Sequence, residues 1–274
     1  MRAVLFFSSQ LEKLMLNTLS FADKFKFDPD FAFAIGVERE FFITDHLGKF
    51  APKAHLILDE IKNPMAGAGS FSYELSACQI ESQSVPCFTE RDIIKCQKIL
   101  DAELYQSAAS LGLKIKSIEV APRNLPLETF KDPQNRYQRI ATSMSKRRLS
   151  AACRVAGTHI HIGMPDKETA LRVYNKVIKH NHKLCIVGDK SFGKRLELYQ
   201  RVTPRYSPIP YSSWQEFEDY ASKEGFKQNP RNCWHMIRLT IHGTIEFRNF
   251  GATSDLNELT SWAMICKNLC LQYQ

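Results

Sequence analysis

The sequence predicts an α+β fold built around a mainly antiparallel β-sheet. Segments with the periodicity of strands and of helices are mixed along the chain without a strict strand–helix–strand alternation. Several connections between predicted strands are also too short for the crossover that a parallel pair requires. A chain of 274 residues buries roughly three quarters of its unfolded surface, which suffices for one large core or two modest ones.

The individual elements follow from hydrophobic periodicity and from residues that start or stop helices. Thr89 is a suitable N-cap for a long helix that Gly112 ends, and Asp166 is a suitable N-cap for a later helix. We expect helices at 10–21, 90–111, 137–149, 167–185, 214–224 and 255–271. Strands are expected at 32–43, 71–83 (then a loop), 114–121 and 154–163, with a hairpin at 236–249.

Composition excludes several classes of protein. No apolar run approaches the ~20 residues of a membrane helix, and the N-terminus is a poor signal peptide. The eight cysteines include no Cys-x-x-Cys pair, so reduced thiols in a cytoplasmic protein are expected. The net charge of +8 favours anionic partners. Because the basic residues are dispersed, nucleic-acid binding is not favoured.

Carboxylates recur on one face of the first predicted strand. Side chains alternate between the two faces of a strand, so Glu38 and Glu40 share a face. The opposite face is apolar except for Arg39. Two neighbouring carboxylates repel each other unless water or a cation separates them. A solvated face and a cation site are equally good interpretations of this strand alone.

The strand at 154–163 repeats the pattern with imidazoles. His159 and His161 share one face, and Ile160 and Ile162 lie on the other. Such a pair can direct both rings into one cavity and there bind a metal or a phosphate. A lone pair of this kind is more often structural or exposed.

Patterning of the predicted hairpin separates an apolar face from a charged one. A loop at 242–244, with Gly243 in a left-handed conformation, would pair Ile241 with Ile245. Arg238 would then face Arg248, and Thr240 would face Glu246. The charged face could be a surface ion-pair lattice or a phosphate clamp, since guanidinium forks fit phosphate oxygens.

Glu74 and Glu81 add two more carboxylates near a strand. If the apolar faces of all these segments share one core, five glutamates and two histidines line one concave surface. Carboxylate oxygens with some imidazole suit Mg²⁺ or Mn²⁺. Arginines at the rim suit a nucleotide polyphosphate. This combination predicts metal-assisted phosphoryl transfer.

Five motifs in this order resemble a known family. They are Gly36-x-Glu38-x-Glu40, Glu74 through Glu81, 135–139, Gly157-x-His159-x-His161-x-Gly163 and Gly243–Thr244-x-Glu246-x-Arg248, with a further likeness in the Trp214 helix. Together they resemble the type 2 glutamate–cysteine ligases and related carboxylate–amine ligases. That family is similar to the catalytic domain of glutamine synthetase, which implies a curved antiparallel sheet with helices packed on its outer face.

The resemblance implies an ATP- and Mg- (or Mn-) dependent ligase. ATP would phosphorylate a glutamate-type carboxylate, and an amine, usually cysteine in the family, would displace the phosphate to give an amide, a step of glutathione biosynthesis. By motif position, the implied metal ligands are Glu38, Glu40, Glu74, Glu81, His159 and Glu246. The implied nucleotide contacts are His161, Arg201, Arg238 and Arg248. Arg238, Glu246 and Arg248 would be catalytic, and Arg136 and Arg139 would hold a substrate carboxylate.

We therefore expect one catalytic domain over 1–274, with residues 1–28 as an N-terminal helical extension. The helical region that usually ends family members is expected to be missing. The expected partners are small-molecule carboxylates and amines, and neither nucleic acid nor membrane; a homodimer is left open. Two alternatives are a phosphotransferase of the guanidino-kinase type and a non-catalytic nucleotide- or metal-binding relative. A zinc hydrolase using His159 and His161 is disfavoured, because no His-Glu-x-x-His motif occurs.

Overall fold

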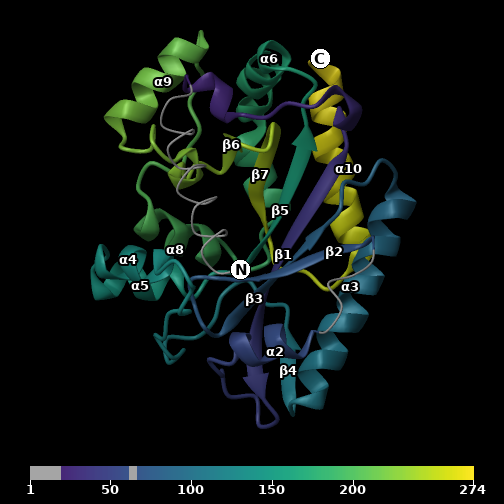
Figure 1. Ribbon diagram of the computed structural model, residues 1–274, viewed down its shortest axis with the longest axis vertical. Coiled ribbons are helices and arrows are strands. Elements are labelled where there is room, and N and C mark those ends of the chain that lie inside the picture. The colour runs from purple at the N-terminus through teal and green to yellow at the C-terminus, as the bar shows by residue number, and fades with distance from the viewer. Residues whose placement is uncertain (1–19, 62–66) are drawn as a thin grey trace, which may run out of the picture.

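The computed structural model describes residues 20–61 and 67–274. Its strands form one seven-stranded sheet of order β2–β3–β1–β5–β7–β6, with β4 paired to β1 (Figure 1). All pairings described between strands are antiparallel. The predicted α+β fold around an antiparallel sheet is thus confirmed. The strands are β1 Ile35–Asp45, β2 Gly69–Tyr73, β3 Gln79–Ser84, β4 Leu113–Lys116, β5 Gly157–Gly163, β6 Ile237–Leu239 and β7 Thr244–Gly251.

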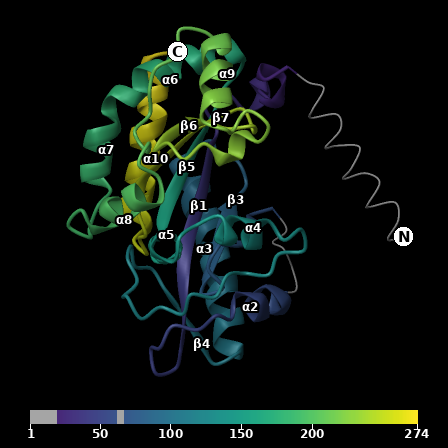
Figure 2. The same cartoon turned by 90° about the vertical axis from the view of Figure 1, so that its left-hand side faces the viewer.

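The α-helices of the described residues pack around this sheet, on both of its sides (Figure 2). They are α2 Ala54–Glu60, α3 Glu90–Ser110, α4 Arg136–Thr142, α5 Lys146–Ala152, α6 Lys167–Val177, α7 Asn181–Val187, α8 Lys194–Val202, α9 Trp214–Lys223 and α10 Leu256–Gln272. Four short 3₁₀ segments are η1 Ala22–Lys24, η2 Pro29–Phe31, η3 Ile178–His180 and η4 Pro230–Asn232. Within this part of the chain, no helix combines the length and apolar character needed to cross a bilayer.

The main core lies between the sheet and the helices α3, α6 and α10. Ile35, Ile160 and Phe247 of three neighbouring strands are buried there with Val173 of α6 and Trp262 of α10. Figure 2 shows α6, α7 and α10 on one side of β1 and α4 on the other. Burying these side chains fixes which way each strand faces, so the alternate residues of β1, β5 and β7 point toward the opposite side.

Several predicted elements are divided or shorter in the structure. The segment 71–83 holds two strands, β2 and β3, rather than one strand and a loop. The predicted helix 137–149 is two helices, because Ser145 caps the start of α5 by accepting the backbone N–H of Arg148. The 3₁₀ segment η3 interrupts the predicted helix 167–185. Strand β4 ends at Lys116, and helix α8 was not predicted at all.

The predicted hairpin register is wrong, because each residue of β6 pairs with a residue two positions earlier in β7 than predicted. Arg238 lies opposite Glu246 rather than Arg248, and the backbone N–H of Thr240 donates to Thr244 at 2.9 Å. The loop is therefore 241–243. Gly243 has φ of +70°, and a Cβ there would lie 2.1 Å from the carbonyl oxygen of Lys26. Both registers keep the same residues on each face, so the predicted separation of charged and apolar faces survives.

The helix predicted at 10–21 lies almost entirely outside the described residues, as does most of the predicted extension 1–28. The described end of the extension packs on α9. The ring centroids of Phe21 and Phe25 lie 5.0 Å and 5.7 Å from the ring centroid of Phe217. Thr89 caps α3 with a full capping box, and Gly112, at φ of +69°, follows the helix end as predicted. Asp166 caps α6 by accepting the N–H of Thr169.

Candidate active site

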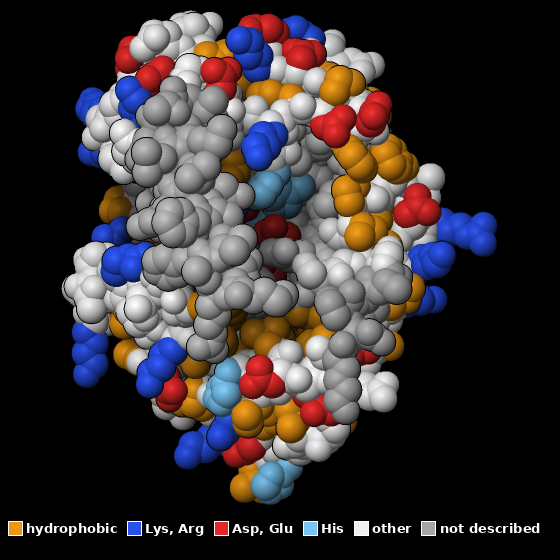
Figure 3. All heavy atoms as spheres, in the orientation of Figure 1, with side chains coloured by type: hydrophobic (Ala, Val, Ile, Leu, Met, Phe, Trp, Pro, Cys, Tyr) orange, Lys and Arg blue, Asp and Glu red, His pale blue; other side chains and the backbone are white. Residues whose placement is uncertain are grey.

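A cavity of about 500 Å³ opens on the side of the sheet opposite the main core. Figure 3 shows the hollow in the surface, with acidic and histidine side chains inside it. Its walls come from β1, β2, β3, β5, β6 and β7, from α4, and from the segment that precedes β6. The residues that line it are Glu38, Glu40, Ser72, Tyr73, Glu74, Leu75, Glu81, Gln83, Arg136, Tyr137, Ile140, His159, His161, Pro230, Arg231, Trp234, Arg238, Leu239, Thr240, Ile241, His242, Glu246 and Arg248.

Strand register brings the predicted residues together. Glu38 of β1 is opposite His159 of β5, and Glu40 is opposite Glu81 of β3. His161 is in turn opposite Glu246 of β7. Because cross-strand neighbours on one face lie about 5 Å apart, four adjacent strands place these side chains in one group. A bulge between Thr158 and Ile160 adjusts the β5–β7 pairing beside them.

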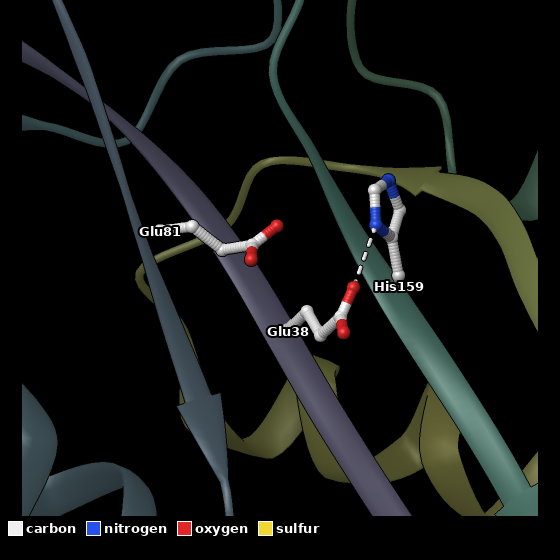
Figure 4. A group of neighbouring side chains, drawn as sticks. All are labelled: Glu38, Glu81 and His159. Carbon is white, nitrogen blue, oxygen red and sulfur yellow. Dashed lines mark hydrogen bonds and ion pairs between the residues drawn. The ribbon is translucent and has the colours of Figure 1, made fainter. Parts of the chain in front are cut away.

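The two histidines flank Glu38. Its Oε2 lies 3.3 Å from Nδ1 of His159, and its Oε1 lies 3.4 Å from Nε2 of His161. Figure 4 shows Glu38, Glu81 and His159 projecting from three strands toward a common space. Burial opposes ionisation of Glu38, but the adjacent His161 and His159 outweigh it and hold the pKa of this carboxyl well below its usual range.

Carboxylates crowd the other side of the cavity. Oxygens of Glu40, Glu74 and Glu81 lie within 4.8 Å of one another. Burial and then the charge of Glu40 raise the pKa of Glu74 from 4.5 to about 7. Burial, followed by repulsion from Glu38, Glu74 and Glu40, raises the pKa of Glu81 well above its usual range. Without an added cation, the group therefore holds protons that isolated carboxyls would release.

Glu246 is fully buried and is held by two arginines. Nε of Arg238 donates to its Oε2, and Nη1 of Arg248 donates to its Oε1, both at 2.5 Å. Burial raises its pKa, but attraction to Arg238 and Arg248 prevails and lowers the pKa far below that of an ordinary glutamate. Glu246 is thus ionised, and each oxygen keeps a second lone pair for another partner.

The donor set fits a hard divalent cation. Three groups each bring three ligand atoms within 4.8 Å: Glu38 with Glu81 and His159, Glu38 with His161 and Glu246, and Glu40 with Glu74 and Glu81. Oxygen-rich sets of this kind suit Mg²⁺ or Mn²⁺. The buried Nε2 of His161 makes no hydrogen bond to a described residue and has the carboxylate of Glu38 beside it at 3.4 Å, so it can serve as a ligand next to that carboxylate.

Two of the predicted arginines do not reach the cavity. The guanidinium of Arg201 pairs with Glu197, one turn earlier on α8. The buried face of α8 consists of Arg195, Leu198, Tyr199 and Val202, whose helical spacing excludes Arg201. On α4, Arg136 and Ile140 line the cavity, whereas Arg139 is exposed and donates to the carbonyl of Gln134. The structure thus places Arg201 and Arg139 outside the set of residues that line this cavity, and their proposed roles stay predictions.

Several lining residues were not predicted. Tyr73 and Tyr137 form one wall, with ring centroids 5.7 Å apart and nearly perpendicular planes. Arg231 and Trp234 form another wall from a segment without regular periodicity. The sequence marks these residues only by their nearness to predicted ones. Tyr137 directly follows Arg136, and Arg231 lies a short distance before Arg238 along the chain.

Comparison with known sequences decides the family. The sequence profile of glutamate–cysteine ligase family 2 matches residues 34–182, more than half of the chain. This protein belongs to glutamate–cysteine ligase family 2. The matched region carries β1, β3 and β5, and with them most of the carboxylate–histidine group.

Family relatives are distant but extensive. "Putative glutamate–cysteine ligase 2" of Roseiflexus castenholzii is 24% identical over 270 residues, covering 89% of this chain and 67% of that protein. The glutamate–cysteine ligase of Halobacterium salinarum is 24% identical over 237 residues, covering 81% of this chain and 65% of that protein. This family member thus spans about two thirds of the length of these relatives.

A solved structure supports the fold. The bifunctional glutathione synthetase from Pasteurella multocida superposes with a TM-score of 0.61 at 13% identity, covering 88% of this chain and 37% of that one. At this identity the likeness concerns the arrangement of strands and helices alone. It agrees with the glutamine synthetase-like fold expected of the family.

Proposed function

We propose that this member of glutamate–cysteine ligase family 2 is an ATP- and Mg²⁺-dependent carboxylate–amine ligase. It would phosphorylate a glutamate-type carboxylate and transfer the acyl group to an amine, forming a γ-glutamyl amide. The observation that carries this proposal is the group of five glutamates and two histidines that faces Arg238 and Arg248 in one cavity. Family membership supports the ligase class, and cysteine is the expected amine.

The residues have distinct proposed roles. Glu38, Glu40, Glu74, Glu81, His159 and Glu246 would hold divalent ions, which would supply positive charge to offset that of the phosphates. Arg238 and Arg248 project from β6 and β7 and would contact the nucleotide phosphates, together with His161. A guanidinium can bind two phosphate oxygens at once and keeps its charge throughout the reaction. Neither arginine needs to move far, because Glu246 already fixes both.

Arg136 would bind a carboxylate of the substrate. It lines the cavity from α4, and its guanidinium carbon lies 5.4 Å from the ring centroid of Tyr137. Stacking on an aromatic ring leaves the edge of the guanidinium available for a bidentate contact. Among the described residues, no carboxylate forms an ion pair with Arg136, so its charge remains available for the substrate.

A second cavity of about 440 Å³ would take the nucleoside end of ATP. It adjoins the first cavity, because His161 and His242 line both. Phe27, Phe31 and Met164 add apolar walls to it, and a purine ring needs such a surface. A nucleotide lying across the shared histidines would direct its phosphates toward Arg238 and Arg248.

The test is a substrate screen that measures ADP release with amino acids supplied singly and in pairs, followed by mass spectrometry of the products. The proposal expects ADP release that needs Mg²⁺ and two substrates and yields an amide. Glu81→Gln should lower the rate at least a hundredfold, because the cation site loses a ligand. The control Glu168→Gln, on the exposed start of α6, should keep the wild-type rate.

Other products would favour the alternatives. A phosphorylated substrate without an amide would indicate a phosphotransferase of the guanidino-kinase type. Absence of heat on titration with Mg²⁺ and a non-hydrolysable ATP analogue would reject nucleotide-dependent chemistry altogether. Binding of the analogue with no turnover of any pair would favour a non-catalytic relative. A single catalytic domain, a homodimer and a cytoplasmic location stay predictions.

A further inference from the structure

Tyr199 of helix α8 lies at the edge of the candidate active site. Tyr199 is 5% exposed, and its side chain projects from the buried face of α8. Nε of Arg248 donates to the hydroxyl of Tyr199 at 3.2 Å. The same hydroxyl donates its proton to the carbonyl oxygen of Trp234 at 3.1 Å. One hydroxyl therefore joins a strand residue to the irregular segment before β6.

This bond completes the fixation of the Arg248 guanidinium. Its Nη1 donates to Glu246 at 2.5 Å, and its Nε donates to Tyr199. A planar guanidinium held through two different nitrogens has little freedom to rotate. The remaining donors are then presented in a fixed direction. Positioning of this kind matters for catalysis, since small displacements of a charged group lower transition-state stabilisation strongly.

Trp234 lies at the other end of the connection and lines the cavity. Neighbouring carbonyls of its segment are also bound by an arginine: Nη1 of Arg238 donates to Arg231 at 3.0 Å and to Cys233 at 2.6 Å. Both arginines that hold Glu246 are thus tied to the segment 231–234, Arg238 directly and Arg248 through Tyr199.

We propose that Tyr199 is a positioning residue that sets the orientation of Arg248 relative to the cavity wall at Trp234. It touches no substrate and acts through Arg248. Its effect on turnover rests on the proposed function, whereas its effect on the Arg248 side chain does not. Phenylalanine at this position keeps the ring but removes both hydrogen bonds, and it leaves the buried Nε of Arg248 without its acceptor.

Tyr174 offers a matched control. It lies on α6 in the main core, is 1% exposed, and its hydroxyl donates to the carbonyl oxygen of Ile209 at 3.0 Å. Tyr174→Phe removes a buried hydroxyl bonded to a backbone carbonyl, as Tyr199→Phe does, but has no contact with Arg248. Any general cost of losing such a bond appears in both variants.

The experiment compares Tyr199→Phe, Tyr174→Phe and the wild type by two measurements. The first is the ¹H–¹⁵N spectrum of arginine Nε groups, in which the Arg248 signal is assigned by its loss in Arg248→Lys. We expect Tyr199→Phe to shift this signal and speed its exchange with water, and Tyr174→Phe to leave it unchanged. An unchanged Arg248 signal in Tyr199→Phe would overturn the proposal.

The second measurement is steady-state kinetics with the substrate pair found by the ADP-release screen. Tyr199→Phe should lower kcat about tenfold or more while KM for the carboxylate changes less than threefold; Tyr174→Phe should match the wild type. Wild-type kcat in Tyr199→Phe would also overturn the proposal. If the wild type turns over no pair, the proposed function fails, and the Arg248 signal alone then decides whether Tyr199 positions Arg248.

Discussion

Neutralising Glu74 should make the metal-free protein more stable at alkaline pH. Glu74 sits beside Glu40 and Glu81 at the crowded side of the cavity, with oxygens of all three within 4.8 Å. Burial and the charge of Glu40 raise its pKa from 4.5 to about 7. The folded state thus binds a proton that the unfolded state has already released between these two values.

The magnitude follows from linkage. Below pH 4.5 the carboxyl is protonated in both states, and no penalty exists. As pH rises toward 7, the folded protein loses stability relative to the unfolded chain, and above pH 7 the loss is complete. A pKa raised from 4.5 to about 7 corresponds to roughly 3 kcal/mol. Because Glu74 keeps some contact with solvent, we expect on the order of 2 kcal/mol.

Urea unfolding of Glu74→Gln and wild type in EDTA, at pH 5 and pH 8, measures this effect. Glutamine resembles the protonated carboxyl, so the two proteins should have similar free energies of unfolding at pH 5. At pH 8 the variant should be more stable by about 2 kcal/mol. Mg²⁺ at pH 8 should stabilise the wild type more than the variant, since a ligand is lost. Equal pH dependence of the two proteins in EDTA would refute the electrostatic reasoning.

Two further predictions concern residues outside the cavity. Asp101→Ala should lower the free energy of unfolding by about 3 kcal/mol, because it leaves Arg39, 1% exposed, without its carboxylate at 2.6 Å; an unchanged urea midpoint would contradict this. Gly157→Ala should cost about 1–3 kcal/mol, since its Cβ would lie 2.4 Å from Nη2 of Arg195. Gly36→Ala is its control, with a nearest contact of 3.4 Å, and an equal loss in thermal unfolding temperature for both variants would oppose the packing argument.

Strand faces could be predicted from the sequence, because alternation is a local property of the backbone. Glu38 and Glu40 had to share a face, and so did His159 and His161. The exact hairpin partner of Arg238 could not be predicted, because two registers of the same parity bury the same apolar residues. The loop position depended instead on the close approach of Gly243 to Lys26, a contact between distant segments.

Helix α8 was missed because its buried stripe includes a charged residue. Arg195 is 6% exposed and donates to the backbone carbonyls of Ala156, Arg248 and Asn249. Hydrophobic periodicity cannot recognise such a position, since the guanidinium is buried only because β7 and the residue before β5 supply acceptors. The same omission hid the buried position of Tyr199, whereas Arg201 was predicted from the family resemblance and not from the helical pattern.

The two faces of the sheet balance their charges differently, and this contrast is the physical argument for a cation in the cavity. On the helix side, Arg39 is satisfied within the protein by Asp101, by Gln97 at 3.1 Å and by the carbonyl of Thr253 at 3.0 Å.

On the cavity side, the lining residues include five glutamates. The described lining residues that lie within 4.0 Å of one of these carboxylates and can carry a positive charge are two arginines and two histidines. Both arginines are already engaged by Glu246, and burial lowers the pKa of His159 to about 4, with the charge of Arg248 acting in the same direction. Among the described residues, Glu74 and Glu81 therefore form no ion pair, and Glu40 has only His159 within 4.0 Å, at 3.7 Å. Because buried charges are retained only where they are paired or coordinate a metal, these three residues are the place where a divalent ion would stabilise the fold most.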